Sequence, residues 1–243
     1  MTTRFAFVLG AVLCLLPAMA QAKTLRLFVL SGQSNMQAMD PDVSFTPTVQ
    51  KAFPDDEIVV VKFAQSGQLI RMWDRQWKPP EGVEPAGKGK NGRHYDTLIG
   101  KVKDTMKDKP APATITFVWM QGEADANHKG YAELYSDALA RVIDQLEADL
   151  GRKDIDVVIG RLSDFGNNDP DNRPGWMAIR QAQVDFASKR PRTAWIDTDD
   201  LNGVSNGLHY GKEGWRQLGE RFAEKAIELV RNNRVKAAPA TQP

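Results

Sequence analysis

The 243-residue chain is 42% hydrophobic and 26% charged, proportions typical of a soluble globular protein. Its 32 basic and 31 acidic residues nearly cancel, so the charge gives no support for binding nucleic acid and favours a neutral, polar substrate. The length suits one α/β domain with a sizeable core.

The first 22 residues differ in composition from the rest. Arg4 is their only charged residue, residues 5–16 are almost wholly apolar, and the small-residue pattern A-Q-A follows at 20–22. This order predicts a secretory signal peptide over residues 1–22. A membrane anchor is the alternative, but the apolar run is short for a membrane span. We therefore expect a secreted or periplasmic protein without membrane contact after cleavage.

Cys14 is the only cysteine of the chain and lies within this leader. Cleavage would leave a mature chain with no cysteine, which excludes a disulfide, a thiol nucleophile and a cysteine-ligated metal.

Five apolar runs rich in β-branched residues predict strands. Because the runs are nearly continuous rather than alternating, we expect strands that are covered on both faces, as in a parallel sheet. The strands are predicted over residues 24–30, 57–64, 114–120, 155–161 and 193–197.

Helical spacing of apolar residues separates these strands. The alternation predicts an α/β fold, a three-layer α/β/α sandwich with a central, mostly parallel five-stranded sheet. We expect one domain over residues 23–235, a surface loop over 78–93 and a frayed tail over 236–243. The helix patterns cover residues 98–106, 134–146, 176–186 and 215–230.

Polar and small residues recur directly after the predicted strands. In open parallel sheets, ligands bind at the carboxyl ends of the strands, so these residues are the candidates for a site. The segments are SGQSN at 31–35, QSGQ at 65–68, QGEAD at 121–125, LSD at 162–164, and the aspartates and loop leading to LHY at 208–210.

A serine in such a position is a candidate nucleophile. Ester hydrolysis by serine needs a hydroxyl, a base that takes its proton, and donors for the oxyanion. Histidine is the natural base near neutral pH, and the chain has only His94, His128 and His209. We favour His209, which lies in a loop at the ligand end of the sheet, and expect structural roles for the other two.

Three sequence blocks carry a resemblance to a known family. GQSNM at 32–36, WMQGEAD at 119–125 and LHYGKEGWRQLGERFA at 208–223 resemble, in this order, blocks of the SGNH hydrolases. The similarity is to their sialate O-acetylesterase and acetylxylan esterase branch, carbohydrate esterase family six. QSGQLIRMWDRQW at 65–77 resembles the glycine block of the same family. The resemblance implies a flavodoxin-like SGNH fold and a serine esterase that removes acetyl groups from carbohydrate, with no metal and no cofactor.

The resemblance also implies roles for individual residues. Ser34 matches the nucleophile and His209 matches the base. The backbone N–H groups of Ser34 and Gly67 and the side-chain amide of Gln121 match the oxyanion hole. The candidate substrate-binding residues are Gln33, Asn35 and Trp73.

One position departs from the family pattern. Family members often place an aspartate three residues before the histidine, and this chain has Asn206 there. An amide can orient an imidazole but stabilises imidazolium less than a carboxylate does. The resemblance suggests Glu123 as the triad acid, although it could equally be a structural carboxylate that bonds loop amides. Further candidates for the acid are Asp125, Asp199 and Asp200.

Two other functions stay open at this point. One is a different SGNH activity, either acetyl transfer between sugars or hydrolysis of other small esters. The second is a glycan-binding protein without catalysis, which Asn206 motivates. Trp73 and Trp77 could stack on a sugar or cover the edge of the core. The sequence does not choose among acetylated glycans, and we expect a monomer.

Overall fold

The computed structural model describes residues 23–165 and 173–237. The predicted signal peptide therefore lies outside the described residues. So does the predicted tail from residue 238 onward, whereas residues 236 and 237 belong to the last helix.

Five parallel strands form the central sheet, in the order β2-β1-β3-β4-β5. The predicted α/β fold is confirmed, and the predicted strands differ from the observed ones by at most two residues at an end. The strands are β1 (Leu25–Gly32), β2 (Glu57–Ala64), β3 (Thr114–Met120), β4 (Asp156–Gly160) and β5 (Thr193–Ile196).

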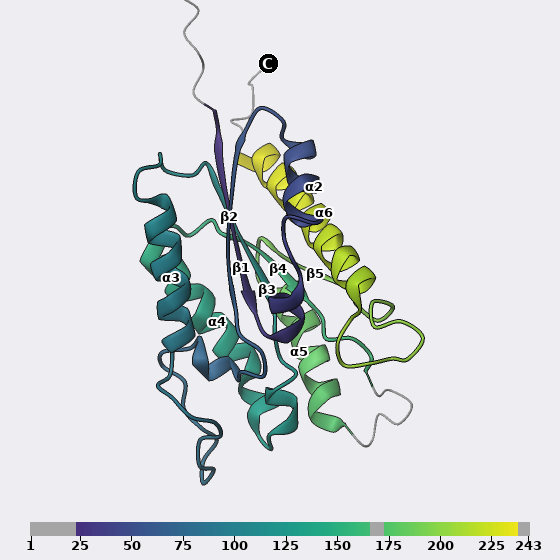
Figure 1. Cartoon of the computed structure of the whole chain (residues 1–243). Helices are drawn as coiled ribbons and strands as arrows, with labels where there is room; N and C mark the ends of the chain where they lie inside the picture. The colour runs from purple at the N-terminus through teal and green to yellow at the C-terminus, as the bar shows by residue number, and fades with distance from the viewer. Residues whose placement is uncertain (1–22, 166–172, 238–243) are drawn as a thin grey trace, which may run out of the picture.

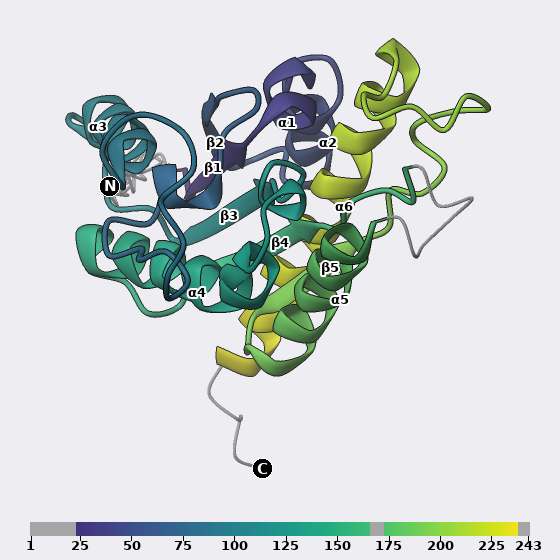
Figure 2. The same ribbon diagram turned by 90° about the horizontal axis from the view of Figure 1, so that it is seen from below.

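Helices cover both faces of this sheet, and Figure 2 shows the resulting three layers from below. One face carries α3 (Arg93–Met106), α4 (Tyr131–Leu150) and α5 (Pro174–Lys189). The other carries α1 (Ser34–Ala38), α2 (Phe45–Ala52) and the long α6 (Lys212–Ala237). Two short 3-10 helices, η1 (Ile70–Met72) and η2 (Asp125–Asn127), follow β2 and β3.

The core lies between the sheet and these helix layers. Every residue of β1 and β4 is buried, as continuous apolar runs in central strands require. In Figure 1 the chain enters β1 at the top and leaves it in the lower half, so the carboxyl ends of the parallel strands all point downward.

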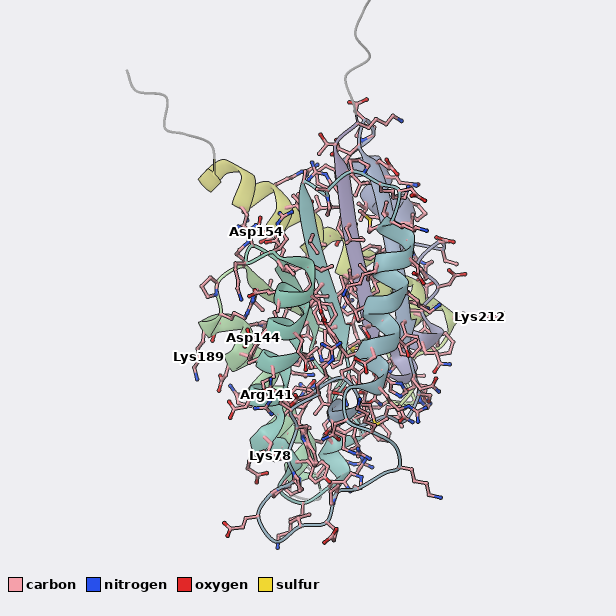
Figure 3. The ribbon with its side chains drawn as sticks, turned by 90° about the vertical axis from the view of Figure 1, so that its left-hand side faces the viewer. Lys78, Arg141, Asp144, Asp154, Lys189 and Lys212 are labelled. Carbon is pink, nitrogen blue, oxygen red and sulfur yellow. The ribbon has the colours of Figure 1, made fainter. Side chains whose placement is uncertain are left out.

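The predicted surface loop is present between η1 and α3. Its backbone is tied to the domain by the buried Arg71, which donates to the carbonyls of Ala86 and Gly89. The Tyr131 hydroxyl accepts a hydrogen bond from the Ala86 N–H at 2.7 Å. Figure 3 places Lys78, at the start of this loop, at the opposite end of the molecule from Asp154, which precedes β4. The loop therefore lies at the carboxyl edge of the sheet.

Candidate active site

The carboxyl ends of β1 and β3 lie side by side where the chain reverses its direction of winding across the sheet. Such a switch point is where open α/β sheets bind ligands. Ser34 follows β1 and begins α1, while Gln121 follows β3 directly. The Gln33 N–H donates to the Met120 carbonyl at 2.9 Å, so the two strand ends are joined.

Gly32 permits this close approach of the two strand ends. Its φ is +146°, and a Cβ there would lie 1.9 Å from the carbonyl oxygen of Met120. Any other residue would therefore push the Ser34 turn away from β3.

Asn35 connects the Ser34 helix to the loop that carries His209. Its Nδ2 donates to the Leu208 carbonyl at 3.2 Å, and its Oδ1 accepts from the Tyr210 N–H at 3.2 Å. One side chain, next to Ser34 in the chain, thus bonds both neighbours of His209. The segments that carry the candidate nucleophile and the candidate base are therefore joined by the hydrogen bonds of Asn35.

Two further bonds complete the surroundings of Asn35, which is 1% exposed. Its Oδ1 also accepts from the Trp215 indole N–H at 3.2 Å, and its Nδ2 lies 3.4 Å from Glu123 Oε1. The amide therefore has no group left to offer a substrate.

The three histidines have different environments. His209 is exposed at the carboxyl edge of the sheet, whereas His94 is buried against Phe63 and Trp73. Burial, together with the nearby Arg93 charge, lowers the pKa of His94 to about 4. His128 is exposed and packs on the ring of Tyr131.

Gly67 lies between two residues that are tied to the site. The Ser66 N–H donates to Gln37 Oε1 of α1 at 2.6 Å, and the Gln68 carbonyl accepts from Gln121 Nε2 at 3.0 Å. Gly67 has φ +66° and nothing within 4 Å of the place where a Cβ would stand. Its N–H has no acceptor among residues 23–165 and 173–237.

The Gln121 side chain is fully buried and closely held. Besides the Gln68 carbonyl, its Nε2 donates to Asp125 Oδ2 at 2.5 Å, while its Oε1 has no partner in the described part of the chain. Both amide hydrogens are therefore engaged in this state. Donation to an oxyanion requires that one of them turn from its present acceptor.

Two buried carboxyl groups lie beneath these residues. Burial raises the pKa of Glu123 to about 7, the Asn35 hydrogen bond opposes that shift and the nearby Asp125 charge adds to it. Burial also raises the pKa of Asp125 to about 7, despite hydrogen bonds from Gln121 and from the Ile70 N–H. A pKa of about 7 means that both carboxyl groups change between the neutral and the charged form near neutral pH.

The other two candidate acids, Asp199 and Asp200, form ion pairs with arginines. Asp199 forms ion pairs with Arg161 and Arg180, and Asp200 pairs with Arg221 at 2.6 Å. These contacts give both aspartates a structural role.

Asn206 occupies the position of the family aspartate, but its side-chain amide bonds other residues than His209. It has φ +44°, its Oδ1 accepts from Asn202, and its Nδ2 donates to the Asp164 carbonyl at 3.3 Å. The amide joins the His209 loop to the segment after β4.

The prediction that Gln33, Asn35 and Trp73 bind the substrate is corrected, because all three side chains are buried. Trp73 is fully buried, donates from its indole N–H to Ser31 Oγ at 3.0 Å and packs edge-on against Trp119. It belongs to the core and has no face for a sugar. Gln33 is 3% exposed, and its Oε1 accepts from the Ala124 N–H at 3.3 Å. Asn35 is engaged as described above, so all three bind the protein itself.

Sequence reasoning missed the connecting role of Asn35 and the buried position of Arg71. The partners of Asn35 are up to 180 residues away, so no local pattern reports them.

Within residues 23–165 and 173–237, no helix is long and apolar enough to cross a membrane. The same residues contain no group of three or more His, Cys, Asp or Glu arranged to hold a metal.

Comparison with known proteins identifies the family. Residues 37–228 match the family described as carbohydrate esterase, sialic acid-specific acetylesterase. The chain belongs to this family. The match begins three residues after Ser34 and includes Gly67, Gln121 and His209. The family predicted from the sequence is confirmed.

Individual relatives are more distant. A probable carbohydrate esterase of Arabidopsis thaliana is 23% identical over 188 residues, which cover 76% of this chain and 62% of the plant protein. The chain thus spans less than two thirds of the length of that curated relative. The crystal structure of a protein from Arabidopsis thaliana superposes with a TM-score of 0.65 at 18% identity, over 85% of this chain and 98% of that one. A carbohydrate acetylesterase from Xanthomonas citri gives 0.60 at 17% identity, over 86% of this chain and 57% of that one. These structures share the fold.

Proposed function

We propose that this protein is a serine esterase that removes O-acetyl groups from carbohydrate. The observation that carries the proposal is the pair of hydrogen bonds that join Asn35 to the backbone on both sides of His209, which supports His209 as the base for Ser34. Family membership supports an ester of a carbohydrate as the substrate. Residues 1–22 further lead us to propose export from the cytoplasm.

The first half of the reaction forms an acetyl-enzyme. Ser34 Oγ attacks the acetyl carbonyl carbon while His209 takes the hydroxyl proton, and the carbonyl electron pair moves onto oxygen. The Ser34 and Gly67 N–H groups bind that oxyanion, joined by Gln121 once an amide hydrogen turns toward it. When the intermediate collapses, the bond to the sugar oxygen breaks and His209 donates the proton to that oxygen.

The second half releases acetate. His209 takes a proton from water, the hydroxide adds to the acetyl carbon, and the bond to Ser34 Oγ breaks as the proton returns to the serine. The oxyanion donors act again in this step. No group beyond the chain and water is needed to balance the atoms.

The contacts above favour a role for Glu123 other than that of a triad acid. Glu123 reaches Asn35 rather than the imidazole, so it supports the frame that holds His209. Asn35 and the backbone of residues 208–210 then set the orientation of the base. We assign Glu123 this positioning role.

Acetate release tests the proposal. Wild type and Ser34→Ala are compared on acetylated xylan and on O-acetylated sialic acid, without a sugar acceptor. We expect release by the wild type and a loss of at least about 10⁴-fold in the variant. Acetylation of an added sugar without net release of acetate would favour a transferase instead. Binding of both substrates with no turnover and no labelling of Ser34 would favour a glycan-binding protein.

A further inference from the structure

Two of the proposed oxyanion donors, Gly67 and Gln121, follow strands that are not neighbours. Gly67 lies in the segment after β2, and Gln121 follows β3 directly. In the sheet β1 lies between β2 and β3, so the ends of these two strands are about 10 Å apart. The hydrogen bonds of the sheet therefore do not set the distance between the two donors.

Asp125 connects the two donor segments. Its Oδ2 accepts from Gln121 Nε2 at 2.5 Å and from the Ile70 N–H at 2.9 Å. Ile70 lies three residues after Gly67 in the chain. A single carboxyl oxygen therefore holds the side chain of one donor and the backbone that follows the other.

Asp125 is fully buried, and the backbone around it is fixed. The His128 N–H donates to the Asp125 carbonyl, and the Ala126 N–H donates to the Gly122 carbonyl, both at 3.0 Å. The second carboxyl oxygen of Asp125, Oδ1, has no partner in the described part of the chain. That oxygen has lost its contact with water without gaining a hydrogen bond, which costs free energy. Packing alone is therefore a weak reason for a carboxyl group at this position.

The two hydrogen bonds of the Gln121 amide differ in strength. Nε2 donates to Asp125 Oδ2 at 2.5 Å and to the Gln68 carbonyl at 3.0 Å. A hydrogen bond to a charged carboxylate is shorter and roughly twice as strong as one to a neutral carbonyl. The bond to Gln68 is therefore the one that opens when an oxyanion forms. Because Gln68 follows Gly67 directly, the hydrogen that is released lies on the side of the Gly67 segment.

We propose that Asp125 is a positioning residue for ester hydrolysis, which anchors the Gln121 amide and the Gly67 segment so that both donors face one oxyanion. Asp125 acts through Gln121 rather than by touching the substrate. Its role is separate from that of Glu123, which lies beside Asn35 on the side of His209. This inference rests on the proposed esterase function.

The charged form of Asp125 is the stronger anchor. Burial raises the pKa of Asp125 to about 7, while the hydrogen bonds from Gln121 and Ile70 and the Arg71 charge oppose that shift. Glu123 and Tyr135 also sense the Asp125 charge: burial, and to a lesser degree that charge, raises the pKa of both. At about pH 8.5 Asp125 is charged, so the test is made at that pH.

A double-mutant cycle tests the inference. Asp125→Asn keeps the shape of the side chain and removes its charge, whereas Gln121→Ala removes the amide that Asp125 anchors. In the wild-type background, we expect Asp125→Asn to lower kcat about tenfold with little change in KM, because it weakens a hydrogen bond to a charged group. In the Gln121→Ala background, the same substitution should lower kcat less than about twofold, because its route to the oxyanion is gone. Acetate release is measured on acetylated xylan and on O-acetylated sialic acid.

Asp74→Asn is the matched control. Asp74 is also fully buried, and its carboxyl group accepts from Arg141 at 2.8 Å and from the Gln76 N–H at 2.9 Å. The loss of this charge should lower the midpoint of urea unfolding and leave kcat unchanged. The unfolding midpoint of every variant is measured beside its kcat. If Asp125→Asn does not fold, Asp125→Ser, which has a smaller uncharged side chain, takes its place in the cycle.

The outcomes separate this inference from the proposed function. An unchanged kcat in the Asp125 variant, with or without a loss of stability, would overturn the positioning role while leaving the esterase intact. An equal loss of kcat in both backgrounds would also overturn it, because Asp125 would then act independently of Gln121. If the wild type releases acetate from neither substrate and does not hydrolyse 4-nitrophenyl acetate, the proposed function fails and the positioning role fails with it.

Discussion

Ser34 and His209 are held in place by two very different parts of the molecule. Ser34 follows β1, a strand that is buried at every residue. The Lys62 ammonium of β2 donates to three backbone carbonyls at the end of α1. The Gln33 N–H, just before Ser34, donates to the Met120 carbonyl at the end of β3. The position of the proposed nucleophile is thus determined by the sheet itself.

His209 lies in a segment, residues 197–211, that has neither helix nor strand. Side-chain contacts attach this segment to the domain: Asn35 on both sides of His209, and the Tyr210 hydroxyl on Thr198 at 2.9 Å. The geometry of Ser34 and His209 therefore depends on a few hydrogen bonds on the side of His209, the proposed base. Substitutions near Ser34 should therefore slow the chemical step directly. Substitutions near the segment 197–211 should slow it by misaligning His209 with Ser34.

Gln121→Ala tests the rigid side, and after the loss expected for Ser34→Ala it should have the largest effect. Loss of an oxyanion donor lowers kcat by about 10²–10³-fold, with a smaller change in KM. The measurement is steady-state kinetics on the preferred acetylated sugar. Gln145→Ala is a matched control, since Gln145 also has a bonded amide, which donates to the Trp73 carbonyl at 2.9 Å, away from the site. An unchanged kcat would mean that Gln121 serves only its bonds to Gln68 and Asp125.

Asn35→Ala removes the connection between the two regions. We expect kcat to fall about 10²-fold, because a displacement of about 1 Å at a catalytic group can have that effect. Asn35→Asp keeps the acceptor for Tyr210 and loses the donor to Leu208, so it should lie between alanine and the wild type. A reduced melting temperature with an unchanged kcat in either variant would show that the amide serves stability alone.

Glu123→Gln tests the buried carboxyl group below this connection. The folded protein raises the pKa of Glu123 from 4.5 to about 7, so the folded state holds the proton more tightly than the unfolded chain. The stability that this group contributes is full below about pH 4.5 and is lost as the pH rises to about 7. The wild type should therefore lose more stability than Glu123→Gln between these pH values.

Urea unfolding at the two pH values measures that difference. Asp125→Asn should reduce the loss in the same direction, because burial also raises the pKa of Asp125. An identical pH dependence in wild type and Glu123→Gln would mean that Glu123 is not a desolvated carboxyl group.

Much of the fold was predictable from the sequence, because continuous apolar runs report strands that are covered on both faces. Helix α2 was not predicted, since only Phe45 and Val49 of it are buried and Pro47 interrupts its pattern. The candidate catalytic positions followed from polar residues at strand ends and from the family resemblance. The roles of Asn35 and Trp73 did not, because burial and partners distant in the chain decide them. A tryptophan among arginines looks the same in sequence whether it faces a sugar or the core.

Asn206→Asp completes the comparison with the smallest expected effect. The substitution restores the family's aspartate, and aspartate tolerates the left-handed backbone found there. However, the Asn206 amide bonds Asn202 and the Asp164 carbonyl, and His209 is exposed to solvent. A solvent-screened charge pair contributes at most about 1 kcal/mol, so kcat should change by less than about fivefold. A rise well beyond that in the kinetics of the variant would mean that residue 206 turns toward the imidazole during catalysis. The loop side would then rearrange between the free and the reacting enzyme, and Asn35 would be the fixed point about which it moves.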